Sequence, residues 1–159
     1  MKKVAIVYYS GTGNTEDMAY AIEDGVKTSG GKAVVMKALE FNNSDISSFD
    51  SIAFGCPAMG AEVLEETEFA PMFEDCKKQI VGKKIALFGS YGWGDGEWMQ
   101  NWETDCKDSG LTLAHESVIC MEAPDEATLS LCREIGATLS KEEEENYNCC
   151  SGYLCTFRL

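Results

Sequence analysis

Three short runs of almost entirely apolar residues constrain the fold of this chain most. Val4–Tyr9, Ser51–Gly55 and Ile85–Gly89 lack the alternation of polar and apolar residues that marks a strand with one face in water. Continuous apolar runs of this length are typical of strands buried on both faces of a parallel sheet. The chain is therefore expected to build a sheet that helices cover on both sides.

Apolar residues at helical spacing separate these runs. They predict helices over about 15–29, 69–76, 98–110 and 127–139, with two further strands at 33–36 and 111–120. Strands that alternate with helices imply βαβ units and right-handed crossovers. The predicted fold class is α/β, a doubly wound five-stranded parallel sheet in three layers. One domain is expected over residues 1–140.

Residues 141–159 depart from this pattern. Four consecutive glutamates lead into an end rich in aromatic residues and cysteines, without periodicity. This composition predicts a C-terminal tail, to which we assign no role, and Cys149 and Cys150 carry no recognisable motif.

The charge of the chain restricts its partners. With 27 acidic and 13 basic residues the formal net charge is -14, which disfavours nucleic acids and anionic membranes and favours basic partners or cationic ligands. A solvated acidic surface without a partner is the alternative interpretation of this charge. We expect no membrane insertion and no signal peptide, and hence a cytoplasmic protein. The eight cysteines form no CxxC pair, and His115 is the single histidine. We therefore expect buried, reduced thiols and no metal site.

Ligands of open parallel sheets bind beyond the carboxyl ends of the strands, where this chain has three unusual loops. The first is Ser10–Thr15, whose two glycines and short polar side chains suit a phosphate at a helix N-terminus. It lacks the lysine of an ATP-binding P-loop, and Glu16 replaces the last glycine of the dinucleotide motif. A tight turn with a helix cap is the alternative reading of these glycines.

The other two loops suit a flat ring. In Cys56–Glu62, Met59 offers a polarisable side chain, Gly60 permits a reorientation of its peptide, and Glu62 is able to accept a ring N–H. Ordinary core filling is the alternative for Met59. Gly89–Gly96 presents two aromatic side chains between four glycines, and such side chains stack on planar ligands.

The segments SGTGNT, CPAMGAEVLEE and GSYGWGDGEWM resemble the three cofactor loops of short-chain flavodoxins from anaerobic bacteria. The resemblance spans about residues 3–140 and implies the strand order 2-1-3-4-5 and one bound FMN. The fifth strand reads as uninterrupted, which is similar to the short-chain branch. Ala61 stands where several relatives carry a polar residue.

The resemblance also implies a role for each matching position. The phosphate would be held by Ser10, Thr12, Asn14 and Thr15 with the backbone of Gly11 to Thr15, Gly13 included. Met59 and Trp93 would cover the two faces of the ring, Glu62 would bind its N3–H, and the peptide of Gly60 would flip. The remaining lining would be Pro57, Ala58, Ala61, Ser90, Tyr91, Gly92, Asp95 and Gly96.

These features predict a low-potential one-electron carrier working mainly between the semiquinone and the hydroquinone of FMN. A Met59 carbonyl turned inward would stabilise the semiquinone. Acids between Gly60 and Asp75 oppose the anionic hydroquinone; one charge about 10 Å away costs about 1.7 kcal/mol at an effective dielectric near 20, of the order of 70 mV. They are Glu62, Glu65, Glu66, Glu68, Glu74 and Asp75.

The expected partners are redox enzymes of the ferredoxin-using type with basic faces, and the carrier is expected to be a monomer. The main rival is an FMN-dependent NAD(P)H:quinone oxidoreductase, but Met59 and Trp93 would cover both faces of the ring and no histidine lies in the three loops. A receiver-type signalling module is the other rival. It requires acids after the first strand and a lysine after the fifth, where this chain has Ser10 and Met121.

Overall fold

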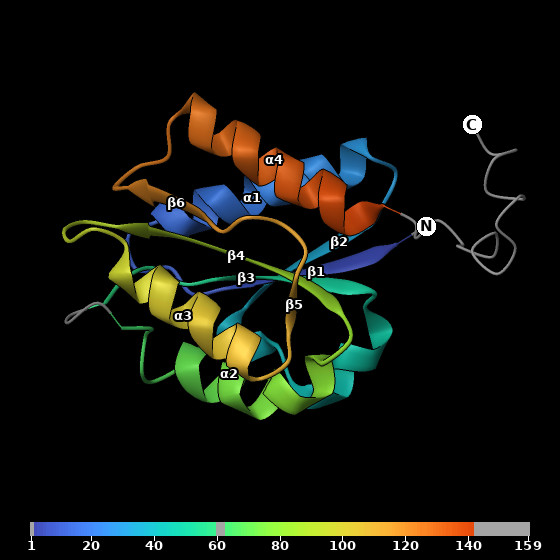
Figure 1. The fold of residues 1–159 in the computed structure, drawn as a ribbon. Helices are drawn as coiled ribbons and strands as arrows, with labels where there is room; N and C mark the ends of the chain where they lie inside the picture. Colours follow the sequence, from blue (N-terminus) through green and yellow to red (C-terminus); the bar gives the residue numbers. More distant parts are fainter. Residues whose placement is uncertain (1, 60–62, 142–159) are drawn as a thin grey trace, which may run out of the picture.

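The computed structural model describes residues 2–59 and 63–141, which form a parallel sheet between two layers of helices (Figure 1). The strands lie in the order β2-β1-β3-β4-β5, and β6 also pairs with β4. The pairings between these strands are all parallel. The fold class and strand order are therefore confirmed. The strands are β1 (Lys3–Tyr8), β2 (Lys32–Lys37), β3 (Ser51–Gly55), β4 (Lys84–Tyr91), β5 (Thr112–Leu113) and β6 (Val118–Met121).

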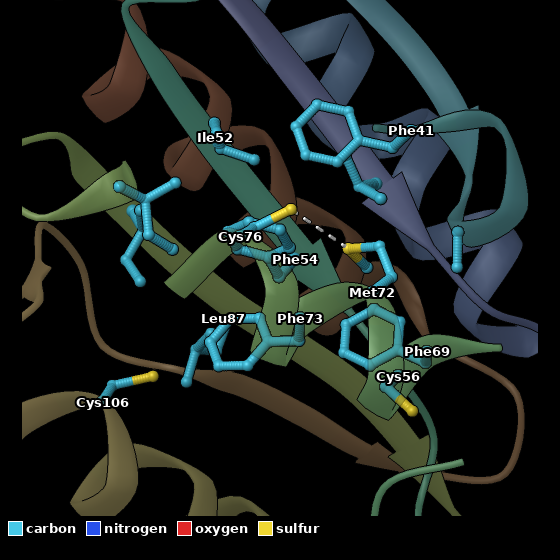
Figure 2. Packing of buried hydrophobic residues seen from close by; sticks show 14 of the residues in the cluster. Phe41, Ile52, Phe54, Cys56, Phe69, Met72, Phe73, Cys76, Leu87 and Cys106 are labelled. Carbon is cyan, nitrogen blue, oxygen red and sulfur yellow. Dashed lines mark hydrogen bonds between the residues drawn. The ribbon is translucent and has the colours of Figure 1, made fainter. Parts of the chain in front are cut away.

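In the described residues, four α-helices cover the sheet, two on each face (Figure 1). They are α1 (Asn14–Thr28), α2 (Phe69–Cys76), α3 (Glu97–Asp108) and α4 (Glu126–Ser140). One face of the sheet packs on α1 and α4, and the other on α2 and α3. Figure 2 shows Phe69 and Phe73 of α2 in the core on this second face. The central strands are buried on both faces, which accounts for their continuous apolar sequences.

Two glycines bring α1 and α4 into backbone contact. A Cβ atom placed on Gly136 would lie 2.3 Å from the carbonyl oxygen of Ile22, and one on Gly25 would lie 2.1 Å from that of Arg133. Neither glycine has a positive φ in its helix, so the requirement is space and not backbone conformation. The helical periodicity did not indicate this close crossing.

The predicted uninterrupted fifth strand is wrong. Residues 112–113 and 118–121 both pair with β4, and a non-strand segment separates them. Ile85 pairs with Leu113 and Phe88 with Val118. An advance of three residues along β4 therefore corresponds to an advance of five residues from β5 to β6. The two additional residues form a bulge-like break that the pattern of apolar residues in 111–120 did not reveal.

Short 3-10 helices complete the described chain at Ala38–Glu40, Asn43–Ser48 and Lys77–Ile80, none of which the sequence predicted. The helix α4 ends one residue before the last described position. The division into a domain of residues 1–140 and a tail of 141–159 thus stays a prediction, and Cys149 and Cys150 lie outside the described residues. Within the described ranges, no helix is both long and apolar enough to cross a membrane.

Candidate functional site

The carboxyl ends of β1, β3 and β4 bring parts of all three predicted loops around one cleft of about 430 Å³. Half of the eighteen predicted site residues line it: Gly11, Thr12, Asn14, Pro57, Ala58, Met59, Ser90, Tyr91 and Gly92. Gly60, Ala61 and Glu62 lie outside the described residues. The remaining six do not line the cleft: Ser10, Gly13, Thr15, Trp93, Asp95 and Gly96.

The first loop opens α1 without a side-chain cap. Gly13 occupies the cap position with φ 96°, a left-handed conformation that favours glycine, and its N–H donates to the Ser10 hydroxyl at 3.0 Å. By contrast, α4 is capped by Asp125, whose carboxylate accepts the Thr128 N–H at 2.8 Å. The N–H groups of the first turn of a helix have no intrahelical acceptor. The uncapped start of α1 therefore offers donors to an anion in the cleft.

Thr15 joins the first loop to the third. Its side chain is 1% exposed, its hydroxyl lies 3.3 Å from that of Ser90, and Oγ1 accepts the Ser90 N–H at 3.4 Å. Ser90 is also buried, and its carbonyl oxygen accepts the Ala58 N–H at 3.0 Å. This pair thus connects all three loops behind the cleft.

The second loop folds back on itself at Met59. The Met59 N–H donates to the Val63 carbonyl at 2.9 Å, and the Val63 N–H donates to the Met59 carbonyl at 3.1 Å. Met59 is half-buried and lines the cleft. Its carbonyl oxygen, the atom predicted to turn toward the ligand, therefore already has a partner within the loop.

Cys56 and Glu65 form the base of this loop. The Cys56 thiol accepts the Glu65 N–H at 3.3 Å and donates to the Pro57 carbonyl at 3.5 Å. The Glu65 carboxylate accepts the N–H groups of Thr67, Glu68 and Phe69 and the Thr67 hydroxyl. Burial opposes the charge of Glu65, but these hydrogen bonds outweigh it and hold its pKa below the usual range.

The third loop is only partly at the cleft. Tyr91 lines it, with its ring 5.4 Å from that of Trp98. Trp93 is 62% exposed and is not among the residues that line the cleft. Asp95 and Gly96 instead line a separate hollow of about 290 Å³ between α3 and the segment before β6. The stacking of Trp93 on a ligand accordingly stays a prediction.

Glu122 lines the cleft although the sequence analysis did not select it. It follows β6 with φ 58°, and its N–H donates to the Tyr91 carbonyl at 2.7 Å. A positive φ is rare for residues other than glycine, and it turns the chain directly after the strand. Because ligands bind beyond the ends of parallel strands, the position of Glu122 directly after β6 could have indicated it from the sequence.

The acidic segment is less uniform than its sequence suggests. Glu65 is 5% exposed, and its carboxylate accepts the N–H groups of Glu68 and Phe69 at the start of α2. Glu74 pairs with Lys77 at 2.8 Å, and Lys77 also pairs with Asp105 at 2.7 Å. Fewer than the six acidic residues counted in the sequence therefore act as unpaired negative charges on the surface. Glu68 and Asp75 line a second groove, of about 480 Å³, which contains none of the predicted site residues.

Known proteins are similar to this chain in both sequence and fold. The flavodoxin family model matches residues 6–136. A flavodoxin from Megasphaera elsdenii is 45% identical over 138 residues, which cover 87% of this chain and 98% of that protein. One from Clostridium beijerinckii is 44% identical over 135 residues, covering 85% and 97%.

Among solved structures, the solution structure of two-electron reduced Megasphaera elsdenii flavodoxin superposes with a TM-score of 0.81 at 45% identity, covering 87% of this chain and 99% of that one. Since these short relatives match along almost their whole length, the resemblance to short-chain flavodoxins is confirmed despite the break in the fifth strand. The chain belongs to the flavodoxin family of flavoprotein electron carriers and is not an enzyme.

Proposed function

We propose that this chain binds one FMN in the 430 Å³ cleft and transfers single electrons at low potential. The observation that carries the proposal is the meeting, in one cleft, of the uncapped start of α1 with the Met59 peptide. Bound FMN supplies a redox centre with three oxidation states, of which we assign the two reduced ones to the working cycle.

The residues present fit the phosphate of FMN. Gly11, Thr12 and Asn14 line the cleft beside the first turn of α1 and bring backbone N–H groups and the Thr12 hydroxyl. All are neutral donors, and the positive end of the helix dipole adds to them. We assign Thr15 and Ser10 to shaping this loop, because their hydroxyls bond to Ser90 and Gly13.

We assign the Met59 carbonyl the role of accepting a hydrogen bond from the reduced ring. A turn of this carbonyl toward the ligand would break its hydrogen bond with the Val63 N–H, which measures 3.1 Å. One neutral hydrogen bond then replaces another, so the net difference is within about 1 kcal/mol, or about 40 mV for one electron. Such a small difference lets the loop respond to the oxidation state. The predicted flip of the Gly60 peptide and the role of Glu62 belong to this proposal.

Acidic residues support the low potential. Glu122 lines the cleft itself, and Glu66 and Glu68 extend the negative charge from the second loop toward α2. We propose that the same charges steer basic-faced redox enzymes of the ferredoxin-using type to a monomeric carrier. The five cysteines in the described part of the chain are buried, which suits a reducing cytoplasm.

Titration of the apoprotein with FMN and with riboflavin tests the proposal. FMN is expected to bind much more tightly than riboflavin, which lacks the phosphate, and Asn14→Ala is expected to weaken only the binding of FMN. Stepwise reduction followed by visible absorption should show two separate one-electron steps. Equal affinity for FMN and riboflavin, or a single two-electron step, would contradict it. Sustained NAD(P)H oxidation with a quinone would instead favour the enzyme alternative.

A further inference from the structure

Cys56 is a buried nucleophilic side chain that the proposed mechanism does not use. It follows β3 directly and is fully buried in the core cluster of α2 and α3 (Figure 2). Burial raises the pKa of its thiol to about 12, so no reactive thiolate is present near neutral pH. Its hydrogen bonds therefore define what it does.

Four hydrogen bonds converge on this residue from different parts of the fold. Its N–H donates to the Phe88 carbonyl at 3.1 Å, and its carbonyl accepts the Trp98 indole N–H at 3.1 Å. These two bonds fix its backbone to β4 and α3. Its thiol bonds to Glu65 and Pro57, the two ends of the loop that carries Met59.

The backbone of β4 approaches Cys56 so closely that only glycine fits at position 89. A Cβ atom on Gly89 would lie 2.2 Å from the Cys56 carbonyl oxygen. On the far side, Glu65 is itself held by the start of α2 through its carboxylate. The thiol thus connects a backbone that is hydrogen-bonded to β4 and α3 with a residue that is hydrogen-bonded to the start of α2.

We propose that the Cys56 thiol is a positioning group that closes the base of the 57–65 loop and keeps Val63 opposite Met59. The Met59–Val63 pair lies between Pro57 and Glu65 in the sequence, so its geometry depends on how the two ends of the loop are held. This inference rests on the proposed FMN site, because the Met59 peptide is the group it positions.

The test compares Cys56→Ala with Cys106→Ala. Both thiols are fully buried in the same core cluster (Figure 2) and both have a pKa raised by burial. Cys106 lies on α3, outside the three loops. The two substitutions remove the same atoms, and only Cys56→Ala removes the bonds at the base of the loop.

Cys56→Ala is expected to weaken FMN binding roughly three- to tenfold relative to Cys106→Ala, the range of a net hydrogen bond. Amide exchange of Glu65 and Val63 in the apoprotein should accelerate by a similar factor, while exchange in β1 matches the control. Cys56→Ser retains a donor and an acceptor and should recover most of the affinity. If Cys56→Ala does not fold, Cys56→Ser and the wild-type exchange rates at Glu65 decide.

Equal FMN affinity and equal Glu65 and Val63 exchange in the two alanine variants would overturn the inference. Rapid exchange at Glu65 in the wild-type apoprotein would do the same. If instead the wild-type protein binds no FMN, the proposed function fails, and the exchange measurements still report on the loop.

Discussion

Replacing Gly136 by alanine tests the contact between α1 and α4. The new Cβ would lie 2.3 Å from the Ile22 carbonyl oxygen and 2.7 Å from the Val26 backbone nitrogen. Both neighbours belong to a helix backbone and have no rotamer to change, so the helices must separate by about 1 Å to reach ordinary contact distances.

Two opposing effects decide the stability of Gly136→Ala. Alanine is favoured over glycine within a helix by about 1 kcal/mol, which would stabilise the variant. Overpacking of a tight interface costs about 1–3 kcal/mol, and here a whole helix has to move. We expect the clash to dominate, with a loss of about 1–2 kcal/mol in the free energy of unfolding and a fall in Tm of about 2–8 °C.

Urea unfolding followed by circular dichroism measures this loss. The FMN concentration is held constant because a bound ligand stabilises the folded state. Ser130→Ala, an exposed change on the same helix, serves as the control and should be neutral or slightly stabilising. In the double variant with Gly25→Ala the losses should be less than additive, since one separation of the helices relieves both contacts. A Gly136→Ala protein that is about 1 kcal/mol more stable than wild type would refute the reasoning.

Three further changes test the site. Glu65→Gln should lower the free energy of unfolding by about 0.5–2 kcal/mol at pH 7. Because the pKa of Glu65 is lower in the folded than in the unfolded state, the stabilisation by its carboxylate is complete above the unfolded pKa of about 4.3 and is lost as the pH falls through the folded pKa. Unfolding titrations from pH 6 to pH 3 should therefore converge for variant and wild type. Thr15→Val leaves the buried Ser90 N–H without its acceptor and should destabilise the apoprotein by about 1–2 kcal/mol; unchanged apoprotein stability would place the hydroxyl in ligand binding alone. Glu122→Gln removes a charge from the cleft lining and should raise the potential of the second one-electron step by up to about 70 mV, measured by redox titration; a lower potential would contradict the electrostatic argument.

Sequence reasoning succeeded where one residue type has one dominant structural cause. The run Val4–Tyr9 predicted a central strand because burial on both faces removes polar residues from the sequence. The glycines of the first loop predicted the start of α1, where Gly13 has the positive φ that glycine favours. The loops that carry Met59 and Ser90 were selected because ligands bind beyond the ends of parallel strands, and both residues line the cleft.

Sequence reasoning failed where function depends on the partner of a side chain. Glu65 looks like any other acid of its segment, but the start of α2 holds it in the interior. Trp93 is exposed in the structure, and its stacking on a ligand stays a prediction. From the sequence alone, Gly136 only lowers the helix propensity of its segment; its need for a missing side chain follows from its contact with Ile22. These relations are long-range, and a single sequence does not record them.

The break between β5 and β6 also bears on how the protein behaves at high concentration. A long, regular edge strand exposes a row of N–H and C=O groups that a second sheet could join. Here that edge offers only residues 112–113 and 118–121, out of register with one another, and the opposite edge, β2, has an exposed lysine at each end. The β5–β6 edge therefore provides no continuous template, and charged lysines flank the β2 edge, so the two extra residues help a concentrated carrier resist aggregation through its sheet.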